Sequence, residues 1–304
     1  MTPGNTATVI GLGSMGWGAA LSLLRAGFHV KGVDIRDEVL KRFTAEGGEA
    51  FTAPVDAGKS DVVFVFVVNS DQAKEVLFGP KGAVQTAAPG TVFLLCVTMA
   101  PSVTVEIAAK LEAAGMAVID APVSGGYQKA LTGEMTVMGS GADAAFAKAA
   151  PALDAVAAKV FRLGEEPGLG SKVKMINQLL AGVHIAAAAE ALTLAAKVGL
   201  DLQTVFDVIR VSAGSSWMFE NRGPHIVDGD YTPRSAVNIF VKDMGIVTGE
   251  ASDAGGSTPL SEAALDLFSQ ASEAGFGLED DAAVAKILAA RSGIVLPGMP
   301  DAEK

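Results

Sequence analysis

The sequence predicts an α/β domain with a doubly wound, mostly parallel sheet over residues 1–165, followed by an all-α domain over residues 166–304. Two observations lead to this division. In the first half, short apolar runs alternate with longer amphipathic segments, which indicates βαβ units. From about residue 165 onward, strand-like runs are nearly absent and apolar residues recur at helical spacing.

The first half contains five apolar runs of strand length, and the segments between several of them have the pattern of helices that end at glycine. The run over residues 61–68 is apolar throughout, as expected for a strand that is buried on both faces. The predicted strands are 7–13, 29–35, 61–68, 91–97 and 116–123, and the predicted helices are 16–27, 37–48 and 100–115.

In the second half, the spacing of apolar residues predicts helices over 170–199, 201–212, 215–228, 235–254, 259–274 and 279–291. The first of these would be roughly 40 Å long at about 1.5 Å per residue, and it should run through the core of its domain. Residues 183–198 are apolar enough to suggest a membrane span. Glu190 and Lys197 interrupt them, and alanine is only weakly lipophilic, so a buried helix is expected.

Composition excludes several classes of function. The net charge of −11 disfavours binding to nucleic acid. The single cysteine, Cys96, lies in an apolar run, so it forms no disulfide within the chain and no cysteine metal cluster. No spacing of His, Asp and Glu indicates a metal site. The N-terminus lacks the basic and apolar regions of a signal peptide, and a soluble cytoplasmic protein is expected.

A glycine-rich turn follows the first predicted strand and opens the first predicted helix. Gly11, Gly13 and Gly16 have the G-x-G-x-x-G spacing of a dinucleotide-binding, or Rossmann, domain. The glycines allow a tight turn and a close approach of the backbone to a pyrophosphate at the helix N-terminus. A purely structural glycine turn is the alternative. The expected cofactor-binding residues of this turn are Gly11, Leu12, Gly13, Ser14, Met15 and Gly16.

Asp34 lies at the end of the second predicted strand, 18 residues after Gly16, where an acid can bind the ribose hydroxyls. A carboxylate about 4 Å from a 2′-phosphate would cost roughly 4 kcal/mol per unit charge at an effective dielectric constant near 20. The sequence therefore favours NAD over NADP, although Arg36 could reduce the penalty.

Lys174 and Asn177 are three residues apart and so share one face of a predicted helix, whereas Lys172 points elsewhere. A free lysine has a pKa near 10.4, which makes it a poor proton acceptor at neutral pH. Desolvation and the positive end of a helix both lower that pKa. This pattern indicates a lysine that exchanges protons, with a solvated lysine at a helix end as the alternative.

Four segments, VIGLGSMG (9–16), DAPVSGG (120–126), GLGSKVKMIN (168–177) and FVKDMG (240–245), occur in this order. Together they resemble the β-hydroxyacid dehydrogenase family, which includes 3-hydroxyisobutyrate dehydrogenase and tartronate semialdehyde reductase, over nearly the whole chain. Two features depart from the family pattern. The loop between Gly164 and Gly168 has one residue more than usual, and Cys96 replaces the usual acid.

The resemblance implies NAD(P)-dependent oxidation of a β-hydroxy acid or a 2,3-dihydroxy acid. Lys174 would be the general acid/base on the substrate hydroxyl, with Asn177 holding the substrate beside it. The other implied residues are Ser124, Gly125 and Gly126 for the substrate carboxylate, Thr98 near the nicotinamide, Asn69 on the adenine-ribose side, Lys242 closing over the cofactor and Asp243 orienting its surroundings. The family also implies a homo-oligomer that associates through the helical domain.

Substrate specificity is expected to depend on Ser215, Ser216 and Asn221, a cluster of short polar residues in an otherwise apolar domain. An apolar substrate tail would leave such groups unpaired, so they favour a polyol acid. The segments NQLLAGVHIAAAAEA (177–191) and AGSSWMFENR (213–222) resemble the branch of the family that oxidises L-threonate to 2-oxo-tetronate. The alternative is a serine helix cap followed by a packed pair, Trp217 and Phe219.

Three other functions remain open at this point. Two are in the same enzyme class: reduction of 2-hydroxy-3-oxopropionate (tartronate semialdehyde), and oxidation of D-glycerate or 3-hydroxyisobutyrate. The third is a non-catalytic NAD-binding sensor of the same fold. Because a sensor could lose its lysine, the presence of Lys174 beside Asn177 and Lys242 favours the enzyme.

Overall fold

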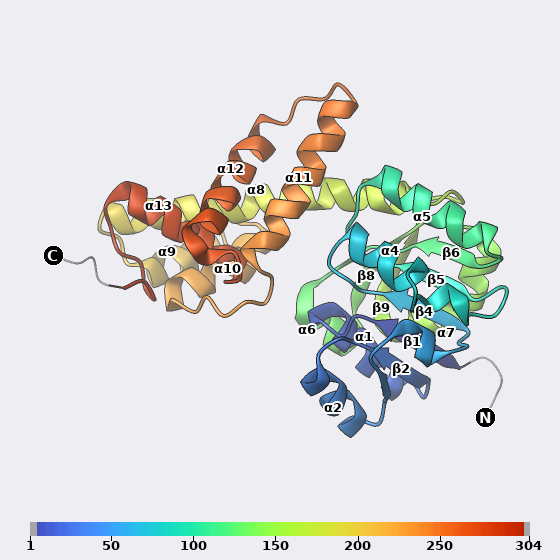
Figure 1. Ribbon diagram of the computed structural model, residues 1–304. Coiled ribbons are helices and arrows are strands. Elements are labelled where there is room, and N and C mark those ends of the chain that lie inside the picture. The colour runs from blue at the N-terminus through green and yellow to red at the C-terminus, as the bar shows by residue number, and fades with distance from the viewer. Residues whose placement is uncertain (1–4, 301–304) are drawn as a thin grey trace. The chain divides into compact units, whose positions relative to one another are not determined.

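The computed structural model describes residues 5–300 and consists of two units, Met1–Lys174 and Met175–Lys304 (Figure 1). The first unit contains a six-stranded parallel sheet in the order β3-β2-β1-β4-β5-β6. Its strands are β1 (Thr6–Ile10), β2 (His29–Val33), β3 (Glu49–Phe51), β4 (Val62–Val65), β5 (Val92–Leu95) and β6 (Ala117–Asp120).

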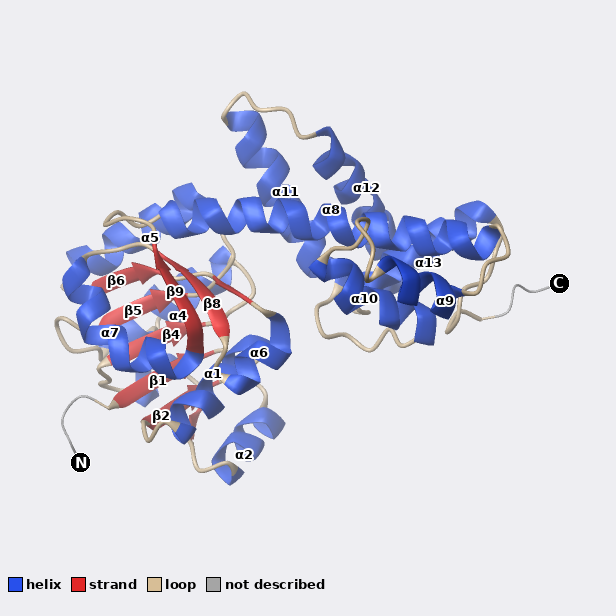
Figure 2. Ribbon diagram, turned by 180° about the vertical axis from the view of Figure 1, so that it is seen from behind, coloured by secondary structure: helices blue, strands red, loops and turns tan. Residues whose placement is uncertain are grey.

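Helices cover both faces of this sheet (Figure 2). The helices of the first unit are α1 (Ser14–Arg25), α2 (Asp37–Ala45), α3 (Pro54–Ala57), α4 (Ser70–Phe78), a 3-10 turn (Ala83–Gln85), α5 (Pro101–Ala113), α6 (Gly126–Thr132) and α7 (Asp143–Val156). A second, three-stranded sheet joins β7 (Val123–Ser124), β8 (Met135–Gly139) and β9 (Ala157–Arg162), with β7 and β8 antiparallel and β8 and β9 parallel.

β4 illustrates how the sheet separates two apolar cores. Val62 and Phe64 pack into one core with side chains from α1, α2 and α7. Val63 and Val65 pack into the other core with side chains from α4 and α5. Successive side chains of a strand point to opposite faces, so this run must be apolar throughout. The prediction of a strand buried on both faces is confirmed.

The second unit is helical and contains most of α8 (Leu169–Lys197), the helix within which the two units divide. The helices that follow are α9 (Leu202–Ile209), α10 (Trp217–Asp228), α11 (Val237–Asp253), α12 (Pro259–Ala271), a π-helical turn (Ser272–Phe276), a 3-10 turn (Asp281–Ala283) and α13 (Val284–Ser292). The fold class is as predicted: a Rossmann-like parallel sheet domain is followed by a helical domain.

α8 is the core helix of the second unit. Ile185, Ala189 and Leu192 on this helix belong to the buried cluster of the unit. Gly182 lies where α8 meets α11, since a Cβ atom at this position would be 2.3 Å from the Met244 sulfur. α8 is also long and apolar enough to cross a membrane, by length and composition, but half of its most apolar stretch is buried within the protein. That burial fits the core helix of a folded domain.

Candidate active site

The three glycines of the first turn have different surroundings. Gly11 has a φ of +91°, and a Cβ at this position would lie 2.6 Å from the carbonyl oxygen of Phe66. A Cβ at Gly16 would lie 1.9 Å from the carbonyl oxygen of Gly11. The fold itself therefore requires both glycines. At Gly13 a Cβ would meet nothing within 4 Å, so this residue borders open space.

This geometry fits a dinucleotide. Gly13 precedes α1, and the approach to its backbone is open, as the pyrophosphate of a dinucleotide requires. Ser14 begins the helix and is exposed, Met15 is partly buried, and Leu12 points into the core. The backbone N–H groups of the first helical turn lack intrahelical partners and can donate to a phosphate.

Asp34 follows β2 and is held by hydrogen bonds from two segments. Its carboxylate accepts from the Leu12 N–H (2.9 Å) and from the Arg36 N–H (3.0 Å) and Nε (2.9 Å). Burial raises the pKa of Asp34, but the hydrogen bonds from Arg36 and Leu12 outweigh burial and keep that pKa below its usual value. Asp34 is therefore ionised at neutral pH and braces the glycine turn, with Arg36 paired to it.

Several of the predicted polar residues follow strands of the parallel sheet. Asn69 lies beyond β4 and caps α4, where its Oδ1 accepts from the Gln72 N–H at 2.9 Å. Thr98 lies beyond β5 and is partly buried. Ser124 ends β7, four residues after β6, and the glycines that follow it have φ angles of +127° at Gly125 and +69° at Gly126. In parallel sheets, ligands bind beyond the carboxyl ends of the strands.

Lys174 and Lys172 have opposite environments on α8. The Lys174 residue is 8% exposed, whereas Lys172 is exposed to solvent. This difference agrees with the prediction that only one of the two lysines shares a helix face with Asn177. Asn177 is three residues beyond Lys174 in the same continuous helix and is partly buried.

Within the helical unit, a chain of hydrogen bonds joins Asn177 to Lys242. Asn177 Nδ2 donates to Gln178 Oε1 at 2.9 Å, and Gln178 Nε2 donates to Asp243 Oδ2 at 2.5 Å. Lys242 Nζ donates to Asp243 Oδ1 at 2.5 Å. The structure thus brings together two of the predicted site residues through Gln178, which was not among the residues expected from the sequence. The only signal for Gln178 in the sequence is an amide beside Asn177 at the start of an apolar stretch.

The three residues expected to determine substrate specificity have local partners around the start of α10. Ser216 caps this helix, with its Oγ accepting from the Phe219 N–H at 3.0 Å. Ser215 Oγ donates to Glu220 at 3.2 Å, and Asn221 Oδ1 accepts from Arg222. The helix cap considered as an alternative is therefore present at Ser216.

The alternative also paired Trp217 with Phe219, but the structure packs Phe219 against a different ring. Phe219 stacks on Phe206, with ring centroids 5.6 Å apart, while Trp217 is half exposed. The reason is the helical geometry: Phe219 is on the buried face of α10 and Trp217 is on its outer face.

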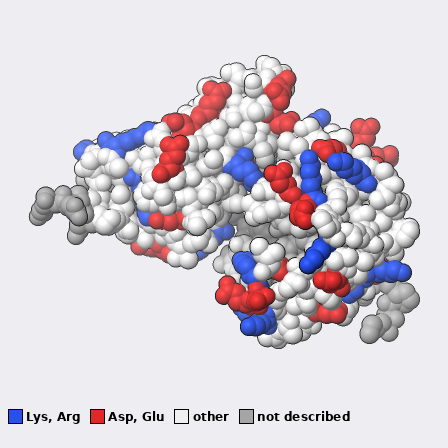
Figure 3. All heavy atoms as spheres, in the orientation of Figure 1, with Lys and Arg blue, Asp and Glu red and all other residues white. Residues whose placement is uncertain are grey.

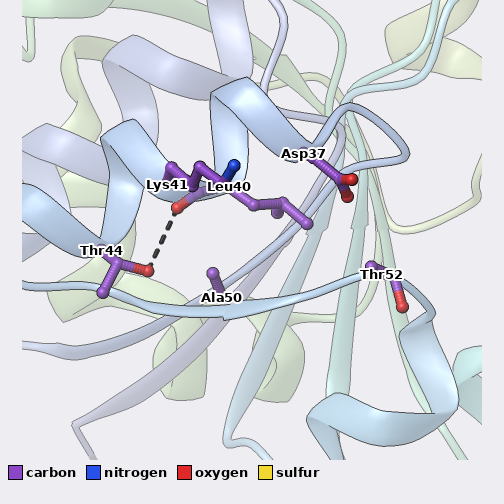
Figure 4. Close-up of a pocket in the computed structure, with 6 residues that line it drawn as sticks. All are labelled: Asp37, Leu40, Lys41, Thr44, Ala50 and Thr52. Carbon is purple, nitrogen blue, oxygen red and sulfur yellow. Dashed lines mark hydrogen bonds between the residues drawn. The ribbon is translucent and has the colours of Figure 1, made fainter.

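A shallow pocket lies elsewhere on the first unit, between α2 and β3, and none of the predicted site residues lines it (Figure 4). Its lining residues are Asp37, Leu40, Lys41, Thr44, Ala50 and Thr52.

Among residues 5–300, no group of three His, Cys, Asp or Glu side chains could hold a metal ion. On the face shown in Figure 3, acidic and basic side chains are interspersed.

Comparison with known proteins relates nearly the whole chain to one group of dehydrogenases. Residues 6–164 match the NAD binding domain of 6-phosphogluconate dehydrogenase, and residues 168–288 match the NAD-binding domain of NADP-dependent 3-hydroxyisobutyrate dehydrogenase. An L-threonate dehydrogenase of Escherichia coli O6:H1 is 53% identical over 292 residues, 95% of this chain and 96% of that protein. The chain belongs to the β-hydroxyacid dehydrogenase family.

Other members of the β-hydroxyacid dehydrogenase family are similarly close. An L-threonate dehydrogenase of Cupriavidus necator is 52% identical over 95% of this chain and 97% of that protein. The crystal structure of a 3-hydroxyisobutyrate dehydrogenase from Salmonella typhimurium is 50% identical, with a TM-score of 0.90 over 93% of this chain and 99% of that one. The predicted family, its L-threonate dehydrogenase branch, an oxidoreductase activity and NAD as cofactor are confirmed.

Proposed function

We propose that this β-hydroxyacid dehydrogenase oxidises L-threonate to 2-oxo-tetronate with NAD, using Lys174 as the general base. The observation that carries the proposal is a buried lysine, three residues before Asn177, in a chain about half identical to several L-threonate dehydrogenases. The pattern of burial on α8 supports Lys174 rather than the exposed Lys172 as the reacting group.

Each proposed residue has a defined task. As the general base, Lys174 would take the proton from the substrate C2 hydroxyl as the carbonyl forms, while Asn177 would hold the substrate beside it. Ser124, Gly125 and Gly126 would bind the substrate carboxylate through a hydroxyl and backbone N–H groups. Gly125 and Gly126 both have positive φ angles, which end the strand direction at this point. A bound NAD would supply the acceptor for the hydride that leaves C2.

The NAD-binding residues come from several segments. The turn from Gly11 to Gly16 would hold the pyrophosphate, and Asp34 and Asn69 would lie on the side of the adenosine ribose. Thr98 would border the nicotinamide, and Lys242 is the proposed cofactor-binding residue of the helical unit. The Asp34 carboxylate favours NAD over NADP because it would repel a 2′-phosphate. Arg36, paired with Asp34, weakens but does not cancel this preference.

The hydroxyl groups at the far end of the substrate are proposed to form hydrogen bonds with Ser215, Ser216 and Asn221. Their local hydrogen bonds are compatible with this role. Ser216 Oγ accepts a bond as the helix cap and retains its O–H as a donor, and Asn221 uses Oδ1 toward Arg222 and retains its amide N–H groups. A site built from such groups binds a polyol acid better than an acid with a methyl tail.

The enzyme is proposed to be a cytoplasmic homo-oligomer that associates through its helical domain. Exposed apolar side chains recur along α8 at spacings of three and four residues, which places them along one side of this helix. They include Ile176, Leu180, Leu194 and the adjoining Val198. Such a stripe is suited to packing against a second copy of the chain. Sedimentation of the purified protein tests this assembly.

The proposed activity is tested by following NADH absorbance with a panel of acids: L-threonate, D-threonate, D-erythronate, D-glycerate and 3-hydroxyisobutyrate, each with NAD and with NADP. We expect turnover on L-threonate with NAD and little on 3-hydroxyisobutyrate. The opposite order would support 3-hydroxyisobutyrate, the substrate in the name of the Salmonella relative, and would overturn the role of the polar cluster.

Two further outcomes have clear meanings. Consumption of NADH with 2-hydroxy-3-oxopropionate, in the absence of activity on the acids, would identify a reductase. Tight NAD binding with no turnover on any member of the panel would support the non-catalytic sensor.

A further inference from the structure

Asp120, the last residue of β6, is completely buried, and its carboxylate accepts four hydrogen bonds. Oδ2 accepts from the N–H groups of Gly168 (2.9 Å) and Ser171 (2.8 Å) and from Ser140 Oγ (3.3 Å). Oδ1 accepts from Ser171 Oγ at 2.8 Å. Two of these partners are backbone N–H groups, which can only donate. Burial raises the pKa of Asp120, and the hydrogen bonds from Ser171, Gly168 and Ser140 oppose that rise.

Most of these donors belong to the start of α8. The first N–H groups of a helix have no partner within the helix, and a side-chain oxygen normally supplies one from the residue just before it. In α8 the partner comes from a strand 51 residues away in the chain. Ser140 assists, because its Oγ accepts from the Gly170 N–H at 3.1 Å.

The start of α8 also packs closely against the backbone of β6 and β8. A Cβ at Gly170 would lie 2.3 Å from the carbonyl oxygen of Met138 and 2.9 Å from that of Asp120. Backbone hydrogen bonds in both directions between Asp120 and Ser140, each 2.9 Å, fix the acid itself. The backbone of Asp120 is therefore fixed at the point where its side chain contacts the start of α8.

Asp120 compensates for an unfavourable sequence at the start of α8. The first turn of α8 contains no acidic residue, and Lys172 and Lys174 follow at once. Cations near a helix N-terminus oppose the helix dipole, and a carboxylate there stabilises it. Asp120 supplies from the sheet the acidic side chain that the helix lacks in its own first turn.

Two proposed functional segments are tied to this one residue. Lys174 lies three residues beyond Ser171, less than one helical turn, and Ser124 lies four residues after Asp120. We propose that Asp120 is a positioning residue, whose bonds to Ser171 and Gly168 fix Lys174 relative to the Ser124–Gly126 segment. This inference rests on the proposed function, in which Lys174 takes the proton and that segment holds the substrate carboxylate.

The test compares Asp120→Asn, Ser171→Ala and their double variant with Thr91→Val. Thr91 is a matched control because it is buried in the same unit and its Oγ1 donates to the Ser60 carbonyl at 3.0 Å, away from α8. We expect kcat to fall between about tenfold and about 10²-fold in Asp120→Asn, as for a misplaced catalytic group. The dissociation constant for NADH, measured by fluorescence, should not change.

The double variant should be no slower than Asp120→Asn, because the two substitutions break the same contact. Amide hydrogen exchange should quicken over residues 169–174 in these variants and stay at the wild-type rate in Thr91→Val. If Asp120→Asn does not fold, the contact is tested by comparing Ser171→Ala with Ser171→Thr. Threonine keeps a hydroxyl that can donate to Asp120, whereas alanine does not. Ser171→Thr should therefore retain kcat, and Ser171→Ala should lose it.

Unchanged kcat in both Asp120→Asn and Ser171→Ala, or losses that multiply in the double variant, would overturn the positioning role. So would parallel losses of kcat in Asp120→Asn and Thr91→Val. Failure of the proposed function is a separate result: wild-type turnover that persists in Lys174→Ala removes the lysine mechanism whatever the Asp120 variants show.

Discussion

The side-chain amide of Gln178 on α8 donates to the carboxylate of Asp243 on α11 at 2.5 Å. Both side chains are buried, and 65 residues separate them in the chain. Because Asp243 also accepts from Lys242, and Gln178 also accepts from Asn177, this bond couples a residue proposed to bind substrate to one proposed to bind NAD. Its loss should therefore affect both sites.

Gln178→Ala is expected to raise KM for both NAD and the hydroxy acid and to lower the melting temperature. The physical reason is that the buried Asp243 carboxylate loses the hydrogen bond from the Gln178 amide, which costs about 1–3 kcal/mol. Steady-state kinetics and thermal unfolding measure the two effects. Gln203→Ala removes an exposed amide that bonds to Asp207 on α9 and serves as the control. Equal effects in the two variants would contradict the coupling.

Lys174→Ala is expected to lower kcat by about 10²–10⁴-fold, the usual contribution of a general base, while NAD still binds. Lys172→Ala provides a matched control, since it removes an exposed lysine two residues away on the same helix. It should leave kcat unchanged. Kinetics on L-threonate, combined with NADH fluorescence titration, separate chemistry from binding. Normal turnover in Lys174→Ala would refute the mechanism.

Asp34→Ala is expected to raise the ratio of kcat/KM for NADP to that for NAD by more than about tenfold. Removal of a like charge near the 2′-phosphate relieves a repulsion of up to about 4 kcal/mol, and Arg36 is released to pair with the phosphate. Glu38→Ala removes an exposed acid nearby and should not change the ratio. An unaltered ratio in Asp34→Ala would mean that this carboxylate does not reach the ribose.

Arg222→Ala is expected to destabilise the helical unit by about 3–5 kcal/mol, because it leaves a buried charge without its partner. Arg222 Nε lies 2.5 Å from Asp281 Oδ1, and its second nitrogen lies 3.0 Å from Oδ2. The exposed pair of Arg162 and Asp143 is the comparison, and Arg162→Ala should cost less than about 1 kcal/mol. Urea unfolding of both variants measures the difference. Similar losses of stability in the two variants would contradict the larger contribution expected of the buried ion pair.

The contiguous parts of the site follow from the sequence. The glycine turn, Asp34 and the pair of Lys174 and Asn177 each lie within one short segment, and the local periodicity places them on a turn, a strand end and a helix face. The difference in exposure between Lys172, which is exposed, and Lys174, which is buried, also follows from helical spacing alone. For Ser215, Ser216 and Asn221, the sequence left open whether they cap a helix or face a substrate, and the structure shows the cap at Ser216.

By itself, the sequence determined the alternation of strands and helices, the change to an all-helical half, the cofactor turn and the family, because each is encoded by neighbouring residues or by ordered motifs. Only the tertiary structure decided that Asp120 caps α8 across 51 residues and that Gln178 joins Asp243 across 65. No local pattern specifies such partners, since they meet only when separate elements pack and bury polar groups that must then be paired.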